Sequence, residues 1–314
     1  MNYNSSFEQL IINAINKCNG MLVDDIAKPF QLLYPFTTEN INGYINYFNL
    51  YCKKLLTVGS SGDQIINASL YDCKDIVCLD ICPYTKFYFY LKLSCLLELD
   101  RDKFLTFLCY KYKTFKDNEL SFHNSNYQKI KSTLRLLDYE SYLFWDELFS
   151  NFRGLDIRKE LFYFDENKMD VIIKSNSYLQ SNIVYDEVRR KIMKTRIEFI
   201  NDDILKSKKD RLFDVIWLSN IGTYLSRHFV KIMVDKVSKE LNDDGMLLIS
   251  YLYKTVKTTK YQQDWNPIYN LEKTFDILQE YSPKLISFIG VDGISFHDST
   301  IKDSILVYTK GKNS

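Results

Sequence analysis

Short apolar runs alternate with segments of helical periodicity between residues 55 and 99. Two runs of four apolar or weakly polar residues have the pattern of buried parallel strands; the first stops at Gly59 and the second at Asp80. Each is followed by a stretch with apolar residues at helical spacing. The pattern predicts a strand–helix–strand–helix unit, over Leu55–Val58, Asp63–Leu70, Ile76–Leu79 and Tyr84–Leu97.

The same alternation returns after residue 196. Two further helices are predicted there, Ser226–Leu241 and Leu271–Gln279, together with five strands, Ile197–Ile200, Phe213–Leu218, Met246–Tyr251, Lys284–Gly290 and Ser304–Lys310. The last two strands have no helix between them, so they form a hairpin and the final strand is antiparallel to its neighbour. The predicted fold class is therefore α/β, a Rossmann-like, mostly parallel seven-stranded sheet with an antiparallel strand near the C-terminus.

Two helical regions flank or interrupt this pattern. Residues 1–52 predict an N-terminal helical segment, and residues 100–195 are too long and too apolar for a loop, so they predict a helical insertion. The core domain then comprises residues 53–99 and 196–314, and we expect the insertion to form a substrate subdomain beside the ligand site. Candidate substrate contacts are Tyr34 and Thr38, for which core packing is the alternative, and Arg158, for which a solvated helix charge is the alternative.

Composition narrows the class of protein. The 314 residues are 46% hydrophobic with a net charge of +1, which indicates a globular chain without the basic field that recruits nucleic acid. The seven cysteines all lie before residue 110, in no disulfide-like framework, which predicts a reducing, cytoplasmic setting. Cys78 and Cys82 lack zinc-site spacing, and no metal site is predicted. No apolar run reaches the roughly 18 residues that a membrane span needs, although peripheral contact with lipid is compatible with the sequence.

The turn after the first strand suggests which ligand the unit binds. A parallel unit of this kind binds its ligand at the carboxyl ends of the strands, where Asp80 is placed to hold ribose hydroxyls. The turn lacks G-x-G-x-x-G, and Asp63 at the start of the first helix repels phosphate but attracts a cation. S-adenosylmethionine, which has a ribose and a sulfonium but no phosphate, fits better than NAD or ATP. A G-x-S-x-G elbow and a G-K-[ST] motif are both absent, which argues against serine hydrolysis and Walker-type nucleotide binding.

Several spaced motifs carry a resemblance to a known family. The stretches LLTVGSSGD, DIVCLD, IEFINDDI, FDVIWLSNIGTYL and LNDDGMLLIS, with the strand order, resemble the class I S-adenosylmethionine-dependent methyltransferases over residues 50–99 and 196–310. The resemblance implies that the cofactor's methionyl part lies at Gly59, Ser60, Ser61, Gly62 and Asp63, its ribose at Asp80 with Ile81 as a further contact, its adenine at Asp202 or Asp203, and its reacting end at Ser219 and Asn220.

The sequence also departs from the family pattern. Val58 stands where the family usually has an acid before the glycine turn, and Asn220 is not followed by the N-P-P-Y of amino-methylating enzymes. The turn, the DICP stretch and LSN followed by Tyr-Leu are similar to a second branch, the diacylglycerol 3-amino-3-carboxypropyltransferases.

Three functions therefore stand as expectations. The first is methyl transfer from S-adenosylmethionine to a small molecule or lipid headgroup, with Asn220 and Tyr224 as the candidate catalytic residues. The second is 3-amino-3-carboxypropyl transfer, and the third is a non-catalytic binding or scaffold protein. Both reactions are substitutions at a carbon bound to sulfonium, so we expect the enzyme mainly to align a nucleophile and exclude water. Among the histidines, His228 is expected to be a surface or packing residue.

Overall fold

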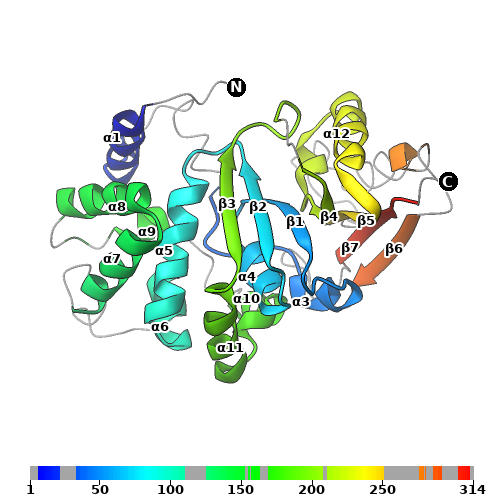
Figure 1. The fold of residues 1–314 in the computed structure, drawn as a ribbon. Coiled ribbons are helices and arrows are strands. Elements are labelled where there is room, and N and C mark those ends of the chain that lie inside the picture. Colours follow the sequence, from blue (N-terminus) through cyan, green and yellow to red (C-terminus); the bar gives the residue numbers. More distant parts are fainter. Residues whose placement is uncertain are drawn as a thin grey trace, which may run out of the picture.

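The computed structural model describes residues 6–21, 33–109, 125–152, 155, 157–162, 169–207, 211–250, 276–278, 280, 286–291 and 303–311. At its centre is a seven-stranded sheet in the order β3-β2-β1-β4-β5-β7-β6 (Figure 1). The strands are β1 (Lys54–Val58), β2 (Asp75–Asp80), β3 (Arg196–Asn201), β4 (Phe213–Trp217), β5 (Leu241–Ser250), β6 (Ile286–Val291) and β7 (Asp303–Thr309).

The strand directions confirm the predicted fold class. β1 to β5 pair in parallel, whereas β7 is antiparallel to both of its neighbours, β5 and β6. The chain places β2 and β3 on one side of β1, and then β4 and β5 on its other side. Where the strand order reverses in this way, the carboxyl ends of the central strands form a crevice of the kind that binds ligands in doubly wound sheets.

Helices cover both faces of the sheet, because the strand residues alternate between two hydrophobic clusters. Leu55 and Ile76 belong to the larger cluster, and their neighbours Leu56 and Val77 to the smaller one. The smaller cluster is covered by α12 (Arg227–Lys239). The larger one is covered by most of the remaining helices, α1 (Phe7–Cys18), α3 (Ile41–Tyr44), α4 (Asp63–Leu70), α5 (Thr85–Glu98), α6 (Arg101–Leu108), α7 (Ser125–Leu137), α8 (Tyr139–Asn151), α9 (Arg158–Leu161), α10 (Met169–Ser175) and α11 (Asn182–Ile192). Short 3-10 helices are η1 (Ile45–Tyr47), η3 (Ser177–Leu179) and η4 (Ile221–Tyr224).

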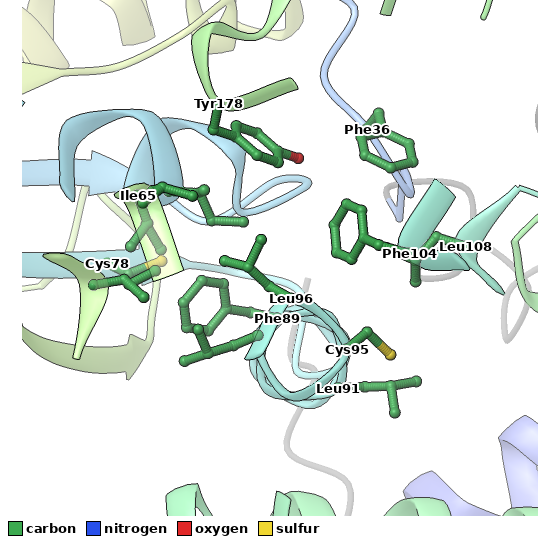
Figure 2. Packing of buried hydrophobic residues seen from close by; sticks show 14 of the residues in the cluster. Phe36, Ile65, Cys78, Phe89, Leu91, Cys95, Leu96, Phe104, Leu108 and Tyr178 are labelled. Carbon is green, nitrogen blue, oxygen red and sulfur yellow. The ribbon is translucent and has the colours of Figure 1, made fainter. Parts of the chain in front are cut away.

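The insertion shares its core with the sheet. Figure 2 shows Phe36 from the N-terminal segment, Phe104 of α6 and Tyr178 of η3 grouped beside α5. The rings of Phe36 and Phe104 meet edge to face at 5.9 Å. The helices of residues 101–192 are thus continuous with the main core, and a separate substrate subdomain stays a prediction.

Two details differ from the sequence prediction. The helix predicted to reach Leu241 ends at Lys239, and β5 begins at Leu241 instead of Met246. The reason is a bulge: Leu241 pairs with Phe213, the register then shifts, and Met246 pairs with Val215. Of the predicted helix 271–279, residues 276–278 are helical, while Tyr251, His123 and His297 lie outside the described residues.

None of the helices within the described ranges is long and apolar enough to cross a membrane.

Candidate functional site

A cavity of about 330 Å³ opens at the carboxyl ends of β1, β2, β3 and β4. Its volume lies within the roughly 300–1,000 Å³ of small-molecule sites. Part of its wall is apolar, from Tyr34, Val58, Leu79, Ile81, Ile204, Leu205, Ile221 and Leu225, and the rest is polar, from Ser60, Asp80, Asp202, Asp203, Ser219 and Asn220. Residues 34–81 and 202–225, which are far apart in the sequence, therefore both contribute to one cavity at the carboxyl ends of the strands, where the sequence predicted the ligand site.

Asp80 is held in place by backbone groups on both sides. Its Oδ2 accepts a hydrogen bond from the backbone N–H of Ser60, and its Oδ1 accepts one from the backbone N–H of Cys82, both at 2.8 Å. Burial raises the pKa of the Asp80 carboxyl, and these N–H donors act in the opposite direction. Since each carboxylate oxygen has two lone pairs, the fixed group can still accept hydrogen bonds from a pair of ligand hydroxyls.

The two glycines of the turn, Gly59 and Gly62, allow Asp80 and α5 to pack closely and are not themselves part of the cavity wall. A Cβ on Gly59 would lie 2.8 Å from Oδ2 of Asp80 and 2.4 Å from Cγ2 of Thr85. A Cβ on Gly62, whose φ of +78° is left-handed, would lie 2.6 Å from the Phe89 ring. At both positions the absence of a Cβ permits close packing within the protein.

The acids after β3 form the side of the cavity next to Asp80. Asp202 accepts at Oδ1 from the backbone N–H of Asp203 at 2.7 Å, and Asp203 accepts at Oδ1 from the backbone N–H of Leu205 at 2.9 Å. The backbone N–H of Asp202 donates to the carbonyl of Asp80 at 3.1 Å, which holds the two strand ends together. Both aspartates line the cavity, where a carboxylate oxygen can accept from a ligand N–H.

Ser219 and Asn220 form the wall at the end of β4. Ser219 has a left-handed φ of +54°, an uncommon conformation for a residue other than glycine. Its carbonyl accepts from the backbone N–H of Ser250, which fixes the turn against the end of β5. Tyr224, the other catalytic candidate, has its backbone in η4, and its side chain lies outside the described residues. His228 is exposed on the first turn of α12, as expected for a surface residue.

Asp63 requires a correction. The sequence places it at the mouth of α4 facing a ligand, but its side chain is fully buried and does not line the cavity. Its Oδ1 forms an ion pair with Lys92 at 2.5 Å and accepts from the Tyr178 hydroxyl at 2.7 Å. Its Oδ2 accepts from the backbone N–H of Thr37 at 2.5 Å and from the Ser61 hydroxyl at 2.9 Å. Asp63 thus holds together α4, α5, η3 and the N-terminal segment.

Of the remaining predicted residues, some line the cavity and others do not. Tyr34, a candidate substrate contact, lines the cavity. Arg158 lies on α9, where a guanidinium N–H donates to the carbonyl of Thr106 at 3.5 Å. Six residues predicted as cofactor or substrate contacts do not belong to the cavity wall, namely Thr38, Gly59, Ser61, Gly62, Asp63 and Arg158.

Glu39 is a charged residue that the sequence analysis missed. It is 3% exposed, and its Oε2 accepts from the hydroxyls of Tyr44 at 2.8 Å and Ser250 at 2.6 Å. Its Oε1 accepts from the hydroxyl of Ser219, which is a cavity residue. Burial raises the pKa of the Glu39 carboxyl, and the three hydroxyl donors oppose that rise. A signal was present, because Glu39 is an acid within the otherwise uncharged, aromatic-rich stretch YPFTTENINGYINYF.

The cavity is acidic. Among the described residues of its wall are Asp80, Asp202 and Asp203, and none is a lysine, arginine or histidine. A wall of this kind disfavours a phosphate and favours a neutral or positively charged ligand. The preference that the sequence analysis assigned to Asp63 therefore comes from other residues.

The chain is similar to known proteins in structure but not in sequence. No family model and no curated protein matches the sequence. Similar solved structures include N-methyltransferase NodS from Bradyrhizobium japonicum WM9 in complex with S-adenosyl-L-homocysteine, with 11% identity, a TM-score of 0.40, and 98% of this chain and 99% of that chain covered. Another is the glycopeptide N-methyltransferase MtfA, with 7% identity, a TM-score of 0.42, and coverages of 88% and 91%.

In fold, the chain resembles the class I S-adenosylmethionine-dependent methyltransferases, and the likeness rests on the sheet itself. The sheet has seven strands and is mostly parallel, with the antiparallel strand β7 near the C-terminus, as the sequence predicted.

Proposed function

We propose that the protein is an S-adenosylmethionine-dependent transferase that methylates a small molecule or a lipid headgroup. The observation that carries this proposal is the fixed carboxylate of Asp80 at the carboxyl end of β2, in a cavity whose other charged wall residues are also acids. An aspartate in this place accepts hydrogen bonds from ribose hydroxyls. The acidic wall disfavours the phosphates of ATP or NAD and favours a nucleoside with a positive charge.

The residues present fit such a cofactor. Asp80 would accept hydrogen bonds from the two ribose hydroxyls, and Asp202 or Asp203 would accept one from the adenine amino group. Ile81 and Leu205 would contact the base, since both are apolar wall residues close in sequence to the acids Asp80 and Asp203. Ser219 and Asn220 would bound the amino-acid end. The bound cofactor would supply a methyl group on sulfonium, already attached to a good leaving group.

The protein's own contribution is then mostly alignment. Asn220 can position a nucleophile through its amide, which both donates and accepts hydrogen bonds. Tyr34, which comes from the N-terminal segment, and the apolar wall residues would reduce the access of water to the reacting atoms. Because the sulfonium is already a good leaving group, we assign the acceleration chiefly to proximity and orientation, and a nucleophile that arrives protonated would also need a base to take its proton. The acceptor would enter beside Tyr34 and Asn220.

Calorimetric titration with S-adenosylmethionine tests the proposal, followed by mass analysis of products formed with cell extract. We expect binding, with release of S-adenosylhomocysteine. Release of methylthioadenosine instead would replace methyl transfer by aminocarboxypropyl transfer. Binding without either product would indicate a binding protein, and no binding at millimolar ligand would contradict the proposal.

A pair of variants tests the ribose assignment. Asp80→Ala removes the carboxylate, and we expect the affinity for S-adenosylmethionine to fall at least tenfold, as for a lost hydrogen bond to a charged group (about 1.5–3 kcal/mol). The matched control is Asp243→Ala, which removes an exposed carboxylate from β5 outside the cavity and should leave the affinity unchanged. A folded Asp80→Ala protein that binds as tightly as the control would disprove the assignment.

A further inference from the structure

Glu39 is a buried carboxylate whose described partners are all neutral. Three hydroxyls, from Ser219, Ser250 and Tyr44, donate to it, and in the described part of the chain no lysine or arginine forms an ion pair with it. Asp63 differs, because the ammonium of Lys92 neutralises it at 2.5 Å. Ionising a buried carboxyl that has no counterion is costly, so a cation brought by a ligand would stabilise the charged form of Glu39.

The hydrogen bonds to Glu39 also set the direction of the Ser219 hydroxyl. When Glu39 is ionised it has no proton to donate, and Ser219 then gives its only hydroxyl hydrogen to Oε1 of Glu39. The Ser219 oxygen is left with lone pairs and no hydrogen, and Ser219 is part of the cavity wall. It therefore offers a hydrogen-bond acceptor to a ligand, and the carboxylate behind it strengthens that acceptor.

The other carboxylate oxygen of Glu39, Oε2, accepts hydrogen bonds from residues outside the cavity wall. Ser250 and Tyr44 donate to the other carboxylate oxygen, and neither is part of the cavity wall. Ser219 is thus the one of the three donors through which Glu39 can act on a ligand.

We propose that Glu39 and Ser219 together form a recognition site for a ligand ammonium group. An ammonium fits because it donates hydrogen bonds to the Ser219 oxygen and supplies the positive charge that Glu39 lacks. The ammonium could belong to the amino-acid arm of the cofactor, in which case the inference rests on the proposed function, or to an amine acceptor. Glu39 acts through Ser219 and is a positioning residue.

The experiment compares ligands that have or lack an ammonium group. Titration calorimetry measures S-adenosylmethionine, S-adenosylhomocysteine and methylthioadenosine, which lacks the amino-acid arm, against the wild type and the variants Glu39→Gln, Ser219→Ala and Ser250→Ala. A second series titrates n-butylamine and its uncharged match n-butanol into protein mixed with S-adenosylhomocysteine. Glu39→Gln preserves the shape of the side chain, and Ser250→Ala removes a donor to the same carboxylate from outside the cavity wall.

If the ammonium belongs to the cofactor, Glu39→Gln and Ser219→Ala weaken the first two ligands about tenfold or more and methylthioadenosine less than twofold. If it belongs to an acceptor, all three nucleosides keep their affinity, but the preference for butylamine over butanol seen in the wild type disappears. In both cases Ser250→Ala has a smaller effect than Ser219→Ala.

Two results would overturn the inference. One is unchanged binding of every ligand in Glu39→Gln and Ser219→Ala. The other is an equal loss for methylthioadenosine and S-adenosylmethionine, which would mean general damage to the cavity. A wild type that binds none of the three nucleosides would refute the proposed function instead, and the amine series would still decide the inference.

Discussion

Asp63 and Glu39 are both buried carboxylates. Glu39 belongs to the N-terminal segment between Leu33 and Asn40, and Asp63 contacts that segment at the backbone N–H of Thr37. Asp63 is neutralised by Lys92, whose ammonium also donates to the carbonyls of Pro35 at 2.8 Å and Ser61 at 3.0 Å. Glu39 has three hydroxyl donors instead. Asp63 is saturated by protein groups and lies away from the cavity, whereas Glu39 reaches the cavity through Ser219.

The difference separates a structural charge from one that is available to a ligand. The Asp63–Lys92 pair joins α4 to α5, and the Tyr178 hydroxyl adds η3. Its loss should therefore act on the fold. The Glu39 cluster joins the N-terminal segment to the ends of β4 and β5, where ligands bind, and its loss should act on binding. Substitutions at the two sites can break or sharpen this contrast.

The largest effect is expected from Lys92→Met. It leaves the Asp63 carboxylate buried without a counterion, and removing one partner of a buried pair costs about 3–5 kcal/mol. Urea unfolding measures the loss. The control is Lys239→Met, which breaks an exposed pair with Asp235 on α12 and should cost less than about 1 kcal/mol. Equal losses for the two variants would remove the structural role of the pair.

A much smaller change in stability is expected from Glu39→Gln. The amide is neutral, so its burial carries no charge penalty, and the three hydroxyls can rotate to satisfy it. We expect the free energy of unfolding at pH 7 to change by less than about 1 kcal/mol, within the range of mild substitutions. A loss as large as that of Lys92→Met would show that Glu39 is as structural as Asp63.

The smallest effect is a pH dependence. Burial raises the pKa of Glu39 above its ordinary value of 4.5, so the native state binds this proton more tightly than the unfolded state. The Glu39 contribution to stability is therefore full below pH 4.5 and is lost as the pH rises through the raised pKa. Tyr44, the titratable group that faces Glu39 among the described residues, has a pKa well above 10 and keeps its proton in this range.

Urea unfolding of the wild type and Glu39→Gln between pH 4 and pH 8 isolates this term. Asp80, whose pKa is also raised by burial, contributes a slope of the same sign to both proteins and cancels in the difference. We expect the wild type to lose stability relative to Glu39→Gln as the pH increases. Parallel curves would mean that Glu39 titrates alike in the folded and unfolded states.

Much of the fold could be predicted, because its signals are local. The helix Asp63–Leu70 has the predicted bounds, and each predicted strand that lies within the described residues is found within a few residues of its place, apart from the earlier start of β5. Asp80 was identified for a similar reason: the carboxyl ends of neighbouring parallel strands meet at one edge, so a polar residue ending a strand lies near a ligand site.

The roles of Asp63 and Glu39 could not be read in this way, because their partners are distant in sequence. Asp63 meets Lys92 and Tyr178 across 29 and 115 residues, and Glu39 meets Ser219 and Ser250 across 180 and 211 residues. One clue was available in the lone lysine of the apolar helix sequence FYFYLKLSCLL, since a buried ammonium requires an anion. It did not indicate which acid would pair with it.

The central claim is that this acidic cavity binds a positively charged nucleoside and excludes phosphates. Parallel calorimetric titrations of the wild type with S-adenosylmethionine and with ATP at low ionic strength test it most directly, because both ligands contain adenosine and differ in the sign of their charge. We predict binding of S-adenosylmethionine and none of ATP. Binding of ATP as tight as that of S-adenosylmethionine, or no binding of S-adenosylmethionine at millimolar concentration, would contradict the account.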